Sequence, residues 1–244
     1  MAEDPPWSGW DVLQIALLTI VSIAVFLVGI AAAAQRFLYP HLAFVEVFKY
    51  PLVSVAAQLC SYILVLGFMA AVVKRDPSRE FWKEVRWIWP TAWSVYLLVG
   101  VALSIGLQGF AHLLPMPKEL PIDRFFQTRA EAWALAIFGM SLAPLMEELF
   151  FRGFLYPVLV RRLGIGVAIV LTAASFGLIH APQLGKAWGP VLIIFLVGLT
   201  LTITRAVTKS VAPGFLIHVA YNATISVLIF IGTDGFRHLE KLSQ

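Results

Sequence analysis

Two adjacent carboxylates and an arginine interrupt a stretch of sequence that is otherwise largely apolar. Glu147, Glu148 and Arg152 all lie within segment 130–163. An ionisable side chain near the centre of a bilayer costs about 2.5–3.5 kcal/mol on insertion scales, so such residues usually persist where a site needs them. On a helix, Glu148 and Arg152 are four residues apart and share a face, which favours an ion pair. Glu147 lies about 100° around the helix axis and is left free for chemistry.

A histidine in the next apolar segment is expected at the same depth as Glu147. Glu147 lies fifteen residues before Arg162, and His180 lies fifteen residues after Ile165, across a turn too short for anything but an antiparallel hairpin. At a rise of about 1.5 Å per residue, both side chains lie about 23 Å from that turn. The sequence therefore predicts that Glu147 and His180 meet inside the bundle.

His218 and Asn222 add a second pair of polar groups, four residues apart on one helical face. They begin about 12–20 Å from a loop on the same side of the membrane, by the same rise per residue. A carboxylate beside imidazoles can act as a general base for water, and an imidazole or amide can donate to the oxyanion that forms on a carbonyl. These groups suit peptide hydrolysis. A glutamate with two histidines is also close to a zinc ligand set, so spacing leaves metal-assisted hydrolysis open.

Composition predicts the elements that must hold these groups. The chain is 60% hydrophobic and 13% charged, with a mean hydropathy of +0.85, which lies outside the range of soluble domains. We expect an integral, multi-pass membrane protein: an all-α, polytopic transmembrane helix bundle of about seven spans. The apolar runs place these spans at 11–34, 50–73, 91–114, 130–163, 165–180, 190–207 and 212–231.

The remaining features indicate membrane topology rather than additional chemistry. Segment 74–87 combines basic residues with interleaved tryptophans, as in an amphipathic segment at the headgroup level. The net charge of +4 comes from basic residues in short loops, so we attribute it to topology and not to nucleic acid. The single cysteine, Cys60, excludes a disulfide framework. The first apolar run is too long for a signal peptide and is expected to be retained.

The polar motifs resemble those of the CPBP family of CAAX prenyl proteases and bacteriocin-processing membrane proteases (Abi or Rce1-like). The family motifs Glu-Glu-x-x-x-Arg, Phe-x-x-x-His and His-x-x-x-Asn match here, in family order, as Glu147/Glu148/Arg152, Phe176/His180 and His218/Asn222. The resemblance covers roughly 130–231. It implies an intramembrane endopeptidase that hydrolyses a peptide bond in a membrane-associated or lipidated protein or peptide, in CAAX-type processing, bacteriocin maturation or self-immunity.

The resemblance also implies roles for the motif residues. Glu147 and His180 would activate water, His218 and Asn222 would form the oxyanion site, and Glu148, Arg152 and Phe176 would support them. Family members have been described as both metalloproteases and glutamate proteases, so no cofactor is assigned and a divalent metal such as zinc is left open. The Phe-Arg-Gly sequence ending at Gly153 resembles the bacterial branch and implies a bacterial plasma membrane.

The sequence divides into an N-terminal three-span region at 1–129, a catalytic helix core at 130–231 and a short tail at 232–244. Expected partners are the lipid bilayer and a membrane-associated substrate, prenylated or not, without nucleic acid. Two alternatives belong to other classes of protein. Intramembrane carboxylates and histidines also suit the proton relay of a transporter or channel, and the bundle could instead be a non-catalytic membrane scaffold.

Overall fold

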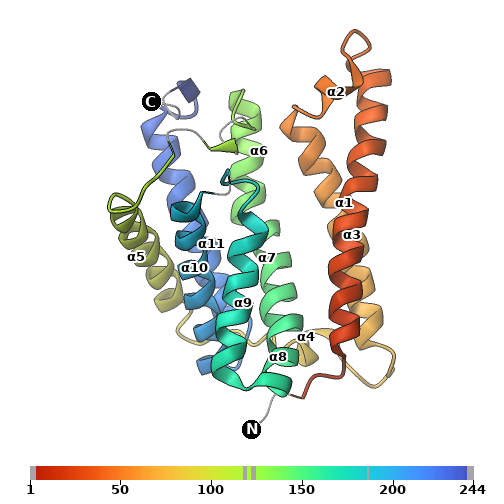
Figure 1. Cartoon of the computed structure of the whole chain (residues 1–244), viewed down its shortest axis with the longest axis vertical. Helices are drawn as coiled ribbons and strands as arrows, with labels where there is room; N and C mark the ends of the chain where they lie inside the picture. The colour runs from red at the N-terminus through yellow and green to blue at the C-terminus, as the bar shows by residue number, and fades with distance from the viewer. Residues whose placement is uncertain (1–3, 118–119, 122–124, 186, 241–244) are drawn as a thin grey trace.

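The computed structural model describes residues 4–117, 120–121, 125–185 and 187–240, and within this part of the chain all regular structure is helical (Figure 1). The prediction of an all-α bundle is therefore confirmed. The helices are α1 (Gly9–Phe37), α2 (Phe44–Val47), α3 (Pro51–Val73), α4 (Phe81–Glu84), α5 (Trp93–Ala111), α6 (Arg129–Met140), α7 (Leu142–Glu148), the π-helix η2 (Leu149–Leu155), α8 (Tyr156–Leu163), α9 (Ile165–His180), α10 (Trp188–Thr208) and α11 (Ala212–Gly232).

Six helical stretches of the described chain are long and apolar enough to cross a membrane, and α9 is a shorter apolar helix. Each of the seven predicted spans corresponds to one of these stretches. The bundle is therefore polytopic, as expected. Large apolar side chains such as Ile20, Ile63 and Leu98 are exposed along these helices. In a bilayer these side chains face lipid, because lipid tails are as apolar as they are.

The fourth span, Arg129–Leu163, is not one continuous α-helix. It breaks at Ser141, whose backbone leaves the helical region, and then passes through η2. Pro144 explains part of the break: it has no N–H to donate to the carbonyl of Met140, where α6 ends. The apolar pattern at 130–163 indicates a single span, long enough to extend past the hydrocarbon or to tilt strongly. The chain instead uses the extra length for two irregular turns on either side of Glu147.

The helices form three groups that lie side by side (Figure 1). The pair α1 and α3 lies on one side, the segments from α6 to α9 lie in the middle, and α5, α10 and α11 lie on the other side. The most extensive packing joins α1 with α3, α9 with α10, and α5 with α11. The middle group, which carries the acidic motif, is thus enclosed between two helical walls.

Close helix packing depends on one glycine between α5 and α11. A Cβ atom added to Gly100 would overlap the carbonyl oxygen of Ile217 and lie 2.7 Å from the Cβ of Ala220. Small residues at such crossings let helix backbones approach closely in membranes, where packing replaces the hydrophobic effect. The contact fixes α11, which carries His218.

A buried cluster joins the α1–α3 pair to the middle group near the N-terminus. The Trp7 ring stacks on Phe154 with 4.3 Å between centroids, and its indole N–H donates to the Phe154 carbonyl at 3.0 Å. Phe81 and Val85 of the predicted amphipathic segment are buried in the same cluster, while Trp82 remains about half exposed. The segment therefore anchors α3 to the middle of the bundle.

Candidate active site

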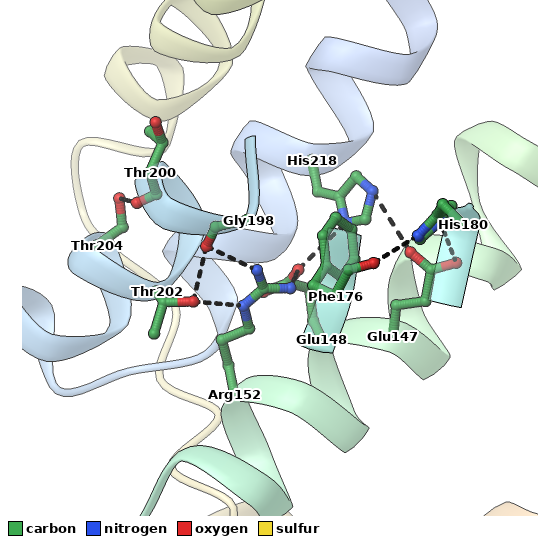
Figure 2. Close-up of polar contacts among 10 residues, drawn as sticks. All are labelled: Glu147, Glu148, Arg152, Phe176, His180, Gly198, Thr200, Thr202, Thr204 and His218. Carbon is green, nitrogen blue, oxygen red and sulfur yellow. Dashed lines mark hydrogen bonds and ion pairs between the residues drawn. The ribbon is translucent and has the colours of Figure 1, made fainter. Parts of the chain in front are cut away.

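The acidic motif lies where α7 ends and the π-helix begins. Glu148 and Arg152 are both fully buried, with the Arg152 Nη1 2.8 Å from the Glu148 Oε1 (Figure 2). The ion pair predicted from the four-residue spacing is therefore present. π-helical turns are rare and often occur at functional sites. Here the turn begins directly after the two carboxylates.

Arg152 also binds groups from two other helices. Its Nε donates to the Thr202 hydroxyl at 3.2 Å and its Nη2 donates to the Gly198 carbonyl at 2.9 Å, both on α10. The guanidinium lies 4.6 Å from the centre of the Phe176 ring on α9. A buried charge needs such a full set of partners. Arg152 thus holds α9, α10 and η2 together and acts as a structural support for Glu148.

His218 approaches Glu148 from α11. Its Nδ1 lies 3.1 Å from the Glu148 Oε1, and because a carboxylate can only accept, the Nδ1 carries the hydrogen. The Glu148 Oε2 is buried and has no hydrogen-bond partner among the described residues. It lies against Gly214, where an added Cβ would come within 2.9 Å of it. Glu148 therefore sets the orientation and tautomer of His218.

His180 is oriented by its own helix. Its Nδ1 lies 2.7 Å from the Phe176 carbonyl oxygen, so the Nδ1 is again the protonated nitrogen. The Phe176 ring lies between the two histidines, with centroids 4.8 Å from His180 and 5.6 Å from His218. Phe176 thus separates the imidazoles and leaves the Nε2 atom of each ring free.

Both free nitrogen atoms face Glu147 (Figure 2). The His180 Nε2 lies 3.8 Å from the Glu147 Oε1, and the His218 Nε2 lies 3.7 Å from its Oε2. These separations are too long for direct hydrogen bonds, and polar contacts at such distances are often bridged by water. Glu147 is 19% exposed whereas Glu148 is fully buried. The neighbouring carboxylates therefore have different environments, one open and one closed.

Glu147 and His180 line a cavity of about 340 Å³ between the α1–α3 pair and the middle group. Residues of α1 and α3 form one wall, and residues of α7, η2 and α9 form the other. Ligand sites in proteins are typically such apolar cavities with a few convergent polar groups. The carboxylate is thus placed where a substrate from the membrane can reach it.

Asn222 lies apart from this convergence. Its side-chain amide donates to the Gly139 carbonyl oxygen at 2.7 Å and so ties α11 to α6. No described contact joins it to Glu147 or either histidine, and it does not line the cavity. The structure therefore brings together Glu147, His180 and His218 but not Asn222. The second amide hydrogen of Asn222 is not engaged by any described group.

The sequence leaves a divalent metal such as zinc open at this site. Within the described part of the chain, no group of three or more histidine, cysteine, aspartate or glutamate side chains has the arrangement to hold a metal ion. Glu147, His180 and His218 are side chains of the types that bind zinc, but they are not arranged around one position where an ion could sit. We therefore derive no chemical step through a metal.

Several residues of the site were missed from sequence. Thr202 and Gly198 bind Arg152, but contacts between separate helices leave no signal in helical spacing. Gln58 and Tyr62 line the cavity and had a detectable signal. They are polar residues four apart in an apolar span, the same pattern that identified His218 and Asn222.

The fold and this geometry define a class: an integral membrane protein with a buried, carboxylate-containing site. Residues 129–224 match the model of a known family, described as type II CAAX prenyl endopeptidase Rce1-like. All three motifs lie within the matched residues, so the family predicted from the motifs is confirmed for this region. No match was found among curated proteins or among solved structures. The family supports, in general, a CAAX-type intramembrane endopeptidase that acts on a membrane-associated substrate.

Proposed function

We propose that this protein hydrolyses a peptide bond of a membrane-associated substrate with Glu147 as the general base. The observation that carries this proposal is the placement of the Glu147 carboxylate 3.8 Å and 3.7 Å from two histidine Nε2 atoms at the wall of one cavity. A water bound among these groups can lose a proton to a carboxylate as it adds to a carbonyl. Transporter and scaffold roles have no comparable observation in their favour.

In the proposed reaction, Glu147 takes a proton from water, and the resulting hydroxide adds to the carbonyl carbon of the scissile bond. The carbonyl oxygen becomes an oxyanion. Of the two residues that the family resemblance assigns to it, Asn222 has a second amide hydrogen to donate, whereas the ring hydrogen of His218 is engaged by Glu148. The proton then passes to the amide nitrogen, the C–N bond breaks, and a carboxylate and an amine are released. His180 orients the water through its Nε2. The Phe176 carbonyl holds the protonated Nδ1 at 2.7 Å, so the accepting Nε2 is turned toward Glu147 and the water.

The supporting residues hold this arrangement without touching the substrate. Glu148 positions His218, and Arg152 neutralises Glu148 within the bundle. Phe176 keeps the two imidazoles apart. The substrate is a peptide or protein segment in the membrane, and the proposed location is a bacterial plasma membrane.

The test is cleavage of a mixed library of membrane peptides, prenylated and unprenylated, by the purified protein. Glu147→Gln keeps the size of the side chain but removes the base, and we expect it to lose the products while remaining folded. A strong chelator should leave cleavage by the unsubstituted protein unchanged. Full turnover by Glu147→Gln would exclude the proposed role of Glu147, and sensitivity to the chelator would show that a metal takes part.

A further inference from the structure

The cavity wall opposite Glu147 carries polar groups that no family motif contributes. Thr19 on α1, and Gln58 and Tyr62 on α3, line this wall. Thr19 donates to the Ile15 carbonyl of its own helix at 2.8 Å, and the Gln58 amide donates to the Ser54 carbonyl at 3.4 Å. The Tyr62 hydroxyl has no hydrogen-bond partner among the residues that the structure describes.

Packing fixes the direction of the Tyr62 ring. The ring stacks on Phe138 of α6, with 5.7 Å between centroids and 15° between planes. A buried or half-buried tyrosine usually places its hydroxyl on a partner, because a lone O–H in apolar surroundings is costly. Tyr62 and Glu147 line the same cavity from opposite walls. Packing therefore holds the Tyr62 ring in the cavity wall that faces the proposed base, and its hydroxyl has no hydrogen-bond partner among the described residues.

The proposed reaction lacks a donor on this side. The Nδ1 hydrogens of His180 and His218 are engaged by the Phe176 carbonyl and by Glu148, so each ring turns an accepting Nε2 toward Glu147. One amide hydrogen of Asn222 donates to the Gly139 carbonyl, and Asn222 does not line the cavity. Stabilising an oxyanion requires donors that are already aimed at the cavity, and the groups around Glu147 mainly accept.

We propose that the Tyr62 hydroxyl donates a hydrogen bond to the oxyanion that forms when water adds to the scissile carbonyl. Tyr62 keeps its proton throughout, so no bond of its side chain breaks. The substrate would lie between the two cavity walls, with its carbonyl carbon toward Glu147 and its carbonyl oxygen toward α3. This inference rests on the proposed function, and it adds to the site a catalytic residue that lies outside the matched residues 129–224.

The test compares Tyr62→Phe with the unsubstituted protein. Phenylalanine keeps the stack on Phe138 and removes only the hydroxyl, so we expect an unchanged melting temperature. Loss of one oxyanion donor typically lowers kcat by about 10²–10³-fold, and we expect a fall of this size with KM nearly unchanged. The matched control is Tyr39→Phe, since Tyr39 stacks on Tyr50 with 4.4 Å between centroids and does not line the cavity. Its turnover should match the unsubstituted protein.

Unchanged kcat in Tyr62→Phe would overturn the role of Tyr62 and leave the proposed function intact. A rise in KM with unchanged kcat would also overturn it, because the hydroxyl would then bind the ground state rather than the oxyanion. If the unsubstituted protein gives no cleavage that depends on Glu147, the proposed function fails, and the role of Tyr62 fails with it.

Discussion

Glu147 and Glu148 approach opposite edges of the same imidazole ring. The Glu148 Oε1 lies 3.1 Å from the Nδ1 of His218, and the Glu147 Oε2 lies 3.7 Å from its Nε2. Consecutive residues of one helix thereby take separate tasks. Glu148 is closed off, paired and structural, whereas Glu147 is open to the cavity.

This separation predicts unequal effects of the same substitution at the two positions. Glu148→Gln leaves Arg152 as an unpaired buried charge, which typically costs about 3–5 kcal/mol. Glu147→Gln breaks no ion pair with arginine and should change the melting temperature little. Thermal unfolding of both variants in detergent measures the difference. Equal melting temperatures for the two variants would contradict the structural role of Glu148.

The Thr202 hydroxyl predicts a second stability effect. It accepts from the Arg152 Nε at 3.2 Å and donates to the Gly198 carbonyl at 2.7 Å. Thr202→Val leaves the Nε unsatisfied, and we expect a loss of about 1–3 kcal/mol. The control is Thr204→Val on the same helix, whose hydroxyl donates to the Thr200 carbonyl at 2.9 Å. Comparable unfolding curves for the two valine variants would show that the Arg152 contact contributes little.

Two glycines of α5, Gly100 and Gly106, should respond in opposite ways when each is replaced by alanine. Gly100→Ala places a methyl group against Ile217 and Ala220, and overpacking of this kind typically costs about 1–3 kcal/mol. Gly106→Ala meets nothing within 4 Å and should be neutral or slightly stabilising, because alanine lowers the entropy lost in a helix. Denaturation of the paired variants checks this. A stable Gly100→Ala protein would mean that α5 and α11 can separate without cost.

Asn222 offers a test of two roles at once. Its amide bonds Gly139, so Asn222→Ala should lower stability by about 0.5–1.5 kcal/mol, the usual net value of one hydrogen bond. If its second amide hydrogen also serves the oxyanion, kcat should fall by about 10²–10³-fold. Turnover and thermal unfolding are measured on the same sample. A stability loss with normal kcat would limit Asn222 to holding α11 against α6.

The sequence was most informative where helical spacing alone decides the outcome. The Glu148–Arg152 pair and the meeting of Glu147 with His180 follow from residue separation and rise per residue, and both are present. The break at Ser141 and the π-helix were not foreseen, because they depend on how the span packs and not on its hydrophobicity. The division of the chain at residues 129 and 231 stays a prediction.

Contacts between helices were the other part that spacing could not supply. Thr202, Gly198 and Gly139 bind the predicted site residues through atoms whose partners lie on different helices. Two of these partners are backbone carbonyls, which every residue has, so residue type carries no signal for them. The placement of Asn222 away from Glu147 has the same origin.

The bond between Trp7 and Phe154 bears on how the protein is assembled. The two residues are 147 positions apart, and the Trp7 ring is almost fully buried only because Phe154 and its neighbours surround it. Since domains form during synthesis from the N-terminus onward, α1 must enter the membrane long before this partner exists. The Trp7 side chain, just before α1, can therefore dock only after the fourth span has been made, and the final closure of the bundle waits on the segment that carries the acidic motif.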